Sequence, residues 1–363
     1  MKRRFQKALC AIFLILTLLC TVIGCSTESP GWRTTAEGIL EADNISWSFD
    51  ADTGELTISG KGIMPDYTIT DGISFDGDAS ATDNRPWREY EGKIKRVTVS
   101  EGITSIGNYA LRGCYYLTEV SLPNTLTRIG AHAFSLTSLV RVEIPQGVVR
   151  IEEDAFHLAK LTSVSFAEDA ALRFIGKGAF GSTYLTEIVI PNGVTEIGVG
   201  AFGFNYRLES VTLPDSLTEI SRSLFVDCTR LKYVTLPNGI TAIGEYAFLN
   251  CGLTSITIPE QVTSIGEQAF RSCRSLAKVS LPASLTEIGS AAFEKCTLLK
   301  RVTVANGSRL EVIGAKAFCN CTVLEEFLLP QGVRPQNVSA DAFENCPRLG
   351  NDFILRDTAS TAA

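Results

Sequence analysis

The sequence of residues 117–134, LTEVSLPNTLTRIGAHAF, decides the fold of this chain. Its apolar positions are Leu117, Val120, Leu122, Leu126, Ile129, Ala133 and Phe134. The first three have the spacing L-x-x-L-x-L, which points three apolar side chains inward around a short strand, and the other four form two further inward pairs. A coil with several apolar sides cannot bury them alone, so the stretch predicts coils that stack into one continuous core.

The Ala-Phe pair that closes this stretch recurs with a period of 22–25 residues. The repeated phenylalanines are Phe134, Phe156, Phe180, Phe202, Phe225, Phe248, Phe270, Phe293, Phe318 and Phe343. Leu111 occupies the same place one period earlier, which makes eleven units. Self-similarity at this period predicts a mostly β solenoid.

Proline and glycine recur at fixed places in most of the units. Proline closes the strand in eight units, where its missing N–H ends a ladder. Glycine follows the isoleucine in eight units, and Ser221 and Ser339 replace it in two others. Because glycine and serine are accepted as helix N-caps, we interpret Ile-Gly-x-x-Ala-Phe as the entry to a short helical turn. Glu152 in the same place does not fit this interpretation.

The combination of strand, proline, Ile-Gly and Ala-Phe-x-x-Cys resembles the BspA-like class of bacterial leucine-rich repeats over roughly residues 93–350. This resemblance implies a leucine-rich repeat solenoid of about eleven coils, each with a short strand and a short turn. It also implies a surface protein that is used in adhesion or ligand binding.

The segment before the repeats has a different pattern. Residues 45–49 alternate as ISWSF, an Asp-Thr-Gly turn follows at 52–54, and residues 56–59 read LTIS. This pattern predicts a β-hairpin. We expect residues 26–92 to form an N-terminal β cap, because the first coil would otherwise expose its apolar end. We assign residues 93–355 to the solenoid and residues 356–363 to a polar tail.

Residues 1–25 have the features of an export signal. A basic start precedes an apolar stretch, and residues 22–25, VIGC, resemble the lipobox of bacterial lipoproteins. That resemblance implies cleavage before Cys25 and a lipid on this cysteine. The alternative is an uncleaved anchor, because residues 8–27 carry no charge and are long enough to span a bilayer. Both interpretations predict an exported protein that is tethered to a membrane.

Charge excludes one class of partner. The formal net charge is −7, and without the first 25 residues 29 basic residues face 40 acidic ones, a net charge of −11. Nucleic-acid binding needs a basic surface, so we expect no nucleic-acid partner.

Cysteine and histidine are residue types that can react or bind a metal. Seven cysteines occupy the position three residues after the repeated Phe, namely Cys114, Cys228, Cys251, Cys273, Cys296, Cys321 and Cys346. A disulfide or soft-metal ladder is one interpretation. Small buried thiols are the simpler one, because Thr137, Ala159, Thr183 and Asn205 take the same position in other coils. Cys319 lies outside this pattern and is interpreted as a free thiol.

The two histidines, His132 and His157, take different positions in adjacent coils and are interpreted as surface residues. No metal motif, phosphate loop or nucleophile motif occurs, so the sequence predicts no cofactor, no metal and no enzyme.

Candidate ligand-binding residues lie on the strand face, where side chains beside the central apolar residue point away from the core. They are Arg96, Glu119, Arg141, Glu187, Tyr233, Lys278, Arg301 and Glu326. Arg96, Glu119 and Arg141 alternate in sign, as cross-strand ion pairs would. The alternative is a solvated sheet face with no ligand. Two-residue insertions within 167–172, 305–310 and 330–337 fall at one point of the coil, which indicates either a binding side or tolerated loop variation.

The family resemblance, and not a residue-level site, implies a non-catalytic cell-surface binding protein that adheres to an extracellular protein or glycoprotein through its repeats. A structural spacer is the second hypothesis. A carbohydrate-binding module is the third, and it requires exposed aromatic residues such as Trp32, Trp47 or Trp87.

Overall fold

A computed structural model describes residues 35–40, 44–69, 83–327 and 333–350. The chain divides into two units, Met1–Thr35 and Ala36–Ala363, and the second unit contains the repeats. The expected signal, Cys25, Trp32 and the tail at 356–363 lie outside the described residues.

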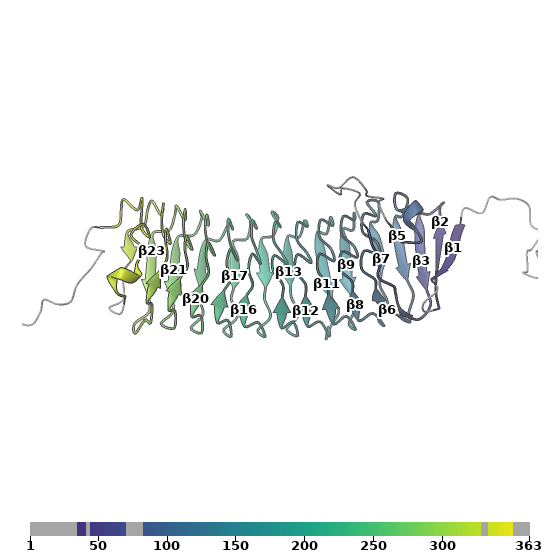
Figure 1. The fold of residues 1–363 in the computed structure, drawn as a ribbon, viewed down its shortest axis with the longest axis horizontal. Helices are drawn as coiled ribbons and strands as arrows, with labels where there is room; N and C mark the ends of the chain where they lie inside the picture. Colours follow the sequence, from purple (N-terminus) through teal and green to yellow (C-terminus); the bar gives the residue numbers. More distant parts are fainter. Residues whose placement is uncertain (1–34, 41–43, 70–82, 328–332, 351–363) are drawn as a thin grey trace, which may run out of the picture. The chain divides into compact units, whose positions relative to one another are not determined.

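Each coil except the last contributes two short strands to two rows of parallel strands that run along the repeats (Figure 1). The first row contains β5 (Arg96–Val99), β7 (Glu119–Ser121), β9 (Arg141–Ile144), β11 (Ser163–Phe166), β13 (Glu187–Val189), β15 (Ser210–Thr212), β17 (Tyr233–Thr235), β19 (Ser255–Thr257), β21 (Lys278–Leu281), β23 (Arg301–Val304) and β25 (Glu326–Phe327). The second row contains β6 (Ile103–Ile106), β8 (Arg128–Ile129), β10 (Arg150–Ile151), β12 (Phe174–Ile175), β14 (Glu196–Ile197), β16 (Glu219–Ile220), β18 (Ala242–Ile243), β20 (Ser264–Ile265), β22 (Glu287–Ile288) and β24 (Val312–Ile313). The described residues thus form a mostly β solenoid, as the period predicts.

Strand register keeps equivalent residues of successive coils side by side. Lys278 pairs with Arg301, which pairs in turn with Glu326. The first row is interrupted between β7 and β9, between β11 and β13, and between β17 and β19, whereas the second row is interrupted only between β14 and β16 among the described strands. At each interruption, the facing edges of two neighbouring strands do not pair with each other.

The core is a continuous column of apolar side chains. The repeated phenylalanines from Phe134 to Phe343 stack on one another, with neighbouring ring centroids 5.1–6.0 Å apart. The rings from Phe134 to Phe318 are fully buried. Burial of each ring by the coils on either side is what couples neighbouring repeats.

The expected short helical turn is not confirmed. The segment around the repeated Phe contains residues with positive φ, such as Tyr246 (58°) and Asn250 (56°), which a right-handed helix does not allow. Its backbone bonds instead to the next coil, with Tyr246 N–H donating to Glu267 O (2.9 Å) and Phe248 N–H to Ala269 O (2.7 Å). The segment therefore forms a third row of hydrogen bonds between coils.

The glycine after the isoleucine has a different role from the expected N-cap. A Cβ on Gly130 would lie 2.6 Å from the backbone nitrogen of Asn108, in the preceding coil. Glycine is thus required because the backbones of two coils approach closely. Glu152, which holds this place in its coil, accepts hydrogen bonds from Arg128 (3.3 Å) and Arg150 (3.0 Å).

The predicted β-hairpin is present before the repeats. β2 (Ile45–Asp50) pairs antiparallel with β3 (Glu55–Ser59), and β3 pairs in parallel with β5. Two further strands, β1 (Thr35–Leu40) and β4 (Gly62–Ile63), and two 3-10 helices, η1 (Arg88–Tyr90) and η2 (Pro335–Asn337), complete the described elements. The hairpin thus continues the first row of strands, and its role as a cap stays a prediction.

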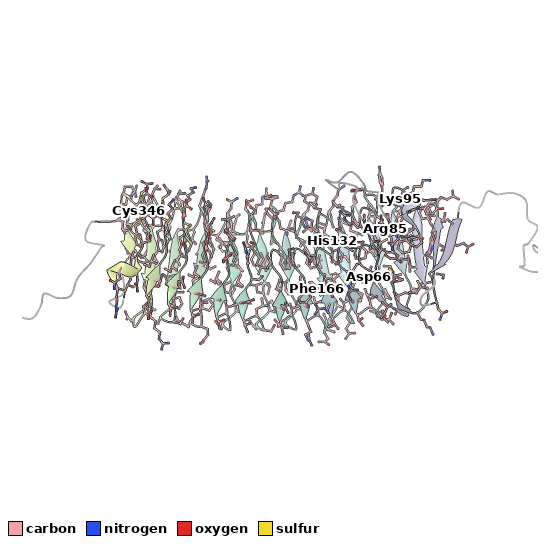
Figure 2. All side chains as sticks on the ribbon, in the orientation of Figure 1. Asp66, Arg85, Lys95, His132, Phe166 and Cys346 are labelled. Atoms are coloured by element: carbon pink, nitrogen blue, oxygen red, sulfur yellow. The ribbon has the colours of Figure 1, made fainter. Side chains whose placement is uncertain are left out.

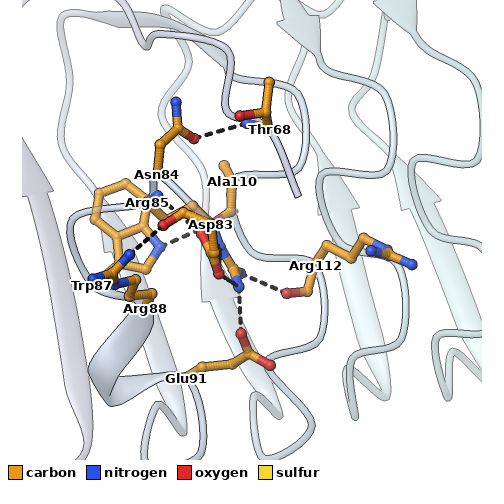
Figure 3. Close-up of polar contacts among 9 residues, drawn as sticks. All are labelled: Thr68, Asp83, Asn84, Arg85, Trp87, Arg88, Glu91, Ala110 and Arg112. Atoms are coloured by element: carbon orange, nitrogen blue, oxygen red, sulfur yellow. Dashed lines mark hydrogen bonds and ion pairs between the residues drawn. The ribbon is translucent and has the colours of Figure 1, made fainter. Parts of the chain in front are cut away.

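A buried polar cluster connects the segment after the hairpin to the first coil (Figure 3). Arg85, only 2% exposed, donates to Asp83 (2.5 Å), to Glu91 and to the carbonyl of Arg112 (2.6 Å). The indole N–H of the fully buried Trp87 donates to the carbonyl of Ala110 (2.8 Å). These bonds fix residues 83–91 against the turn of the first coil.

None of the helices in the described part of the chain has the length and hydrophobicity that a membrane span requires.

Candidate binding surface

The strand face is formed by the outward side chains of the first row. All eight candidate residues on it are exposed, namely Arg96, Glu119, Arg141, Glu187, Tyr233, Lys278, Arg301 and Glu326. Their inward neighbours in the same strands, such as Val142 and Ile188, are buried. Alternation along a strand therefore places the candidates on one open face of the solenoid.

At each end of this face, two neighbouring charged residues form an ion pair. Arg96 Nε lies 2.8 Å from Glu119 Oε2. At the other end Arg301 forms a two-point pair with Glu326, at 2.8 and 2.5 Å, and this bonding lowers the pKa of the Glu326 carboxyl. The two opposite charges within each pair neutralise each other, so the pair offers little net charge to a ligand.

The central candidates are not paired in this way. The alternation predicted for Glu119 and Arg141 stops at Glu119, because β7 and β9 are not paired strands. Among the described residues, Arg141, Glu187 and Lys278 have no ion-pair partner. The charged groups that are open to a ligand thus lie in the middle of the strand face.

A groove opens in the same region, between β11 and β13. Its volume is about 760 Å³. It is lined on one side by 163–167, Asp169, Ala170 and Arg173, and on the other by 187–189 and 191–193. Val164 and Phe166 are half-buried here, whereas Val142 and Ile144, their equivalents in the preceding coil, are buried; Figure 2 labels Phe166.

The groove exists because two features coincide. The first row is interrupted between β11 and β13, so the backbone edges there are unpaired. The two-residue insertion within 167–172 lies at the same place and supplies Asp169 and Ala170 to the lining. Val189, at a position where the following coils have Thr212 and Thr235, is 65% exposed on the rim. The groove therefore combines an apolar floor with hydroxyl and charged groups.

The other two insertions do not line this groove. Residues 305–310 form a turn after β23. The insertion within 330–337 lies partly outside the described residues. Only the first insertion therefore contributes to a described concave site.

The cysteine positions form a row of buried free thiols in the described residues. From Cys228 to Cys346, each thiol lies 3.1–3.2 Å from the carbonyl oxygen of the Phe in the preceding coil, to which it donates. Burial raises the pKa of the Cys228 thiol to about 12. Cys319, outside the row, is also a buried free thiol. In the described residues no cluster of three or more His, Cys, Asp or Glu side chains could hold a metal ion.

The two histidines are brought together, contrary to what their positions in the coils suggest. His132 Nδ1 lies 3.9 Å from Asp154, and His157 Nδ1 lies 3.7 Å from the same carboxylate. Tyr109 stacks on His132 with a centroid distance of 4.8 Å. Both histidines are half-buried, and burial lowers the pKa of His132.

Apart from Tyr233, which is exposed on the strand face as predicted, the exposed aromatic residues lie away from the places where the sequence suggested them. Trp47 and Trp87 are buried in the hairpin region. A row of exposed apolar residues instead follows the turns of the first five coils, between 42% and 61% exposed: Tyr115, Tyr116, Val140, Leu158, Tyr184, Phe204 and Tyr206. We call this set the aromatic edge. A comparison of the positions after Ala-Phe from coil to coil would have revealed it.

Comparison with known proteins gives one family and several structural neighbours. A family model for the BspA type leucine rich repeat region matches residues 89–206, 195–310 and 241–360. A leucine-rich repeat protein from Eubacterium ventriosum is 24% identical, with a TM-score of 0.43, over 86% of this chain and 95% of that one. Another from Bacteroides ovatus is 23% identical, with a TM-score of 0.44, over 85% and 93%. A leucine rich cell surface protein from Faecalibacterium prausnitzii is 21% identical, with a TM-score of 0.40, over 77% and 96%. No curated protein matches the sequence.

Proposed function

The chain belongs to the BspA type leucine rich repeat family, whose model matches most of its length, and from this premise we propose that it is a non-catalytic binding protein of the cell surface. We propose further that its ligand is an extracellular protein or glycoprotein that contacts the strand face. A repeat array offers a long surface of this kind without any catalytic group.

The groove between β11 and β13 is the observation that carries this proposal. It lies on the strand face, and the candidate residue Glu187 lines it. Its half-buried Val164 and Phe166 and the exposed Val189 offer apolar surface, and the serine, asparagine and carboxylate groups around them can orient a ligand through hydrogen bonds. A spacer needs neither an interrupted row of strands nor an inserted loop beside it.

The eight strand-face residues divide into two groups under this proposal. Arg141, Glu187, Tyr233 and Lys278 contact the ligand directly, because their side chains are exposed and make no ion pair in the described residues. Arg96, Glu119, Arg301 and Glu326 hold the ends of the face through their mutual pairs.

Attachment to the cell is the second part of the proposal. A lipid on Cys25 would tether residues 26–363 to a membrane and leave the repeats free for binding. Several acyl chains are needed for stable anchoring, which bacterial lipoproteins provide. Mass spectrometry of the protein from the membrane fraction tests this part, since lipidation adds the acyl mass to a chain that starts at Cys25.

Binding of the full chain to immobilised matrix glycoproteins, mucins and polysaccharides tests the ligand proposal. We expect saturable binding to a protein or glycoprotein that weakens by about tenfold or more in Glu187→Lys and in Val189→Thr. Thr235→Val is the matched control, because it exchanges the same side chains two coils away from the groove.

Three outcomes would contradict the proposal. Equal binding by all three variants removes the groove from the site. Binding to polysaccharides alone supports the carbohydrate hypothesis. Absence of binding across the panel favours a structural spacer.

A further inference from the structure

The aromatic edge is a second surface, distinct from the groove. Leu158 and Phe204 share one position in their coils, two residues after the repeated Phe. Tyr115, Tyr184 and Tyr206 share another, four residues after the Phe or its equivalent. Since equivalent positions of successive coils stack about 4.8 Å apart, five coils place these side chains along roughly 20 Å of one edge.

Two of these residues are held in a conformation that does not suit them. Leu158 and Phe204 have φ values of 59° and 60°. The equivalent residues of later coils, also with positive φ, are Asp227, Asn250, Ser272, Lys295, Asn320 and Asn345, of which the aspartate and the asparagines tolerate this conformation best. A bulky residue there is strained by about 1–2 kcal/mol. Leu158 and Phe204 also remain 46% and 42% exposed, so burial in the solenoid does not offset the strain.

The edge is less apolar in the second half of the solenoid, where Leu298 (55% exposed) is the one large exposed apolar residue on these turns among the described residues. The positions equivalent to Tyr184 and Tyr206 carry no aromatic residue in later coils, where they are Thr229, Gly252, Arg274, Thr297, Thr322 and Pro347. The turns, their hydrogen bonds and the Phe stack continue unchanged through both halves. The fold therefore does not require apolar residues at these positions. Exposed tyrosines on the turns, confined to one half of the described solenoid, indicate a surface that is kept for a partner.

Charge on the edge indicates the kind of partner. Lys160 occupies the same position as the tyrosines, and it is exposed without an ion-pair partner among the described residues. The guanidinium of Arg207 lies 4.7 Å above the ring centroid of Tyr184. The two charged residues of the edge, Lys160 and Arg207, are thus both basic, although the net charge of the chain is −7.

We propose that the aromatic edge docks a protein whose contacting surface is apolar with carboxylates around it. Tyrosine and arginine dominate the energetic centres of protein interfaces, and here they lie side by side. A glycan fits less well, because Val140 and Leu158 offer no ring for a sugar to stack on. Arg207 also covers one face of Tyr184.

The test uses a displayed library of random 16-residue peptides, selected on the immobilised full chain. We expect enrichment of peptides that combine Asp or Glu with Leu, Phe or Trp. Synthetic peptides with the enriched sequence should bind about tenfold or more weakly to the double variant Tyr184→Thr/Tyr206→Thr, and to Lys160→Glu/Arg207→Glu. Thr297→Ala/Thr322→Ala, at the same positions in the polar half, should leave binding unchanged.

Further variants separate this proposal from the first one and from misfolding. Val189→Thr removes the groove residue and should not affect these peptides, so failure of the groove proposal leaves this result intact. Leu158→Asn should weaken binding without lowering the melting temperature, because it relieves strain. Enriched peptides without acidic residues, equal binding to the edge variants, or no enrichment at all would overturn the proposal.

Discussion

At the scale of single residues, the position three places after the repeated Phe accepts several small side chains, most of which donate to a Phe carbonyl, although Ala159 has no side-chain donor. Cys273 donates to the carbonyl of Phe248, 3.1 Å away. In a coil without cysteine, Asn205 donates to the carbonyls of Phe180 and Phe202, each at 2.8 Å. The carbonyl of Phe248 also accepts from the backbone N–H of Cys251 (3.2 Å), so the thiol is a second donor to it and fills the corner of the coil.

The buried thiols predict a loss of stability at alkaline pH. Burial raises the pKa of Cys114, Cys228 and Cys273 to about 12, from an ordinary value near 9. Above pH 9 the unfolded chain releases these protons while the folded chain keeps them, so the free energy of unfolding falls as pH rises from 9 to 12. Each thiol removes about 1.4 kcal/mol per pH unit in that range. Urea unfolding at pH 7, 9 and 10 measures this loss.

Cys273→Thr is the variant that isolates one thiol. Threonine takes this position in Thr183 and donates from there to the carbonyl of Phe180 (3.3 Å). The variant should lose about 1.4 kcal/mol less than the natural chain between pH 7 and pH 10. Other groups titrate equally in both proteins and cancel in the comparison. An identical alkaline loss in both would show that Cys273 ionises normally in the folded state.

At the scale of the structural elements, the sequence predicts what repeats within a coil and misses what arises between coils. The strands follow from the alternation of residues such as Val120 and Leu122, and the outward candidates follow from the same alternation. The turn after Ile129 was misassigned because Gly130 is compatible with a helix N-cap. Its actual cause, the approach of the Asn108 backbone, belongs to the neighbouring coil.

The candidate site also combines features that the sequence of one coil predicts with features that arise only between coils. Glu187 is predicted to be exposed by its place in the strand, and it is. The groove beside it depends on the missing pairing between β11 and β13, which no single coil encodes. The aromatic edge lies on turns, outside the strand columns in which binding residues were expected.

Substitution of the inter-coil glycine tests the corrected role of this position. A Cβ on Gly289 would lie 2.7 Å from the backbone nitrogen of Glu267 and 2.8 Å from the carbonyl carbon of Gly266. Gly289→Ala should therefore lower the free energy of unfolding by about 1–3 kcal/mol, as overpacking does. Gly92→Ala is the control, because a Cβ there meets no atom within 4 Å, and it should change stability by less than about 0.5 kcal/mol. If Gly289→Ala stabilises the protein, as relief of glycine entropy in a helix would, the helical interpretation is restored.

At the scale of the whole molecule, each coil contacts chiefly its two neighbours, so stability is transmitted from coil to coil. A coil at the end of such an array has only one neighbour and needs something else to cover it. Before the first coil lie the hairpin and the segment 83–91, held by the bonds of Arg85 and Trp87. If this region is a cap, its loss must destabilise the adjacent coils first and the distant coils least.

Trp87→Ala tests this prediction by hydrogen exchange. The indole is fully buried, packs edge-on against Tyr67 with centroids 5.3 Å apart, and donates to Ala110. Its removal should cost about 3–5 kcal/mol locally. Exchange should rise in β3, β5 and β6, and should stay unchanged in β19 to β23. Phe270→Ala, in the middle of the stack, should instead raise exchange in the coils on both sides of it. A uniform rise along the chain in Trp87→Ala would mean that the repeats unfold as one cooperative unit, and a rise confined to the hairpin would mean that the first coil needs no cap.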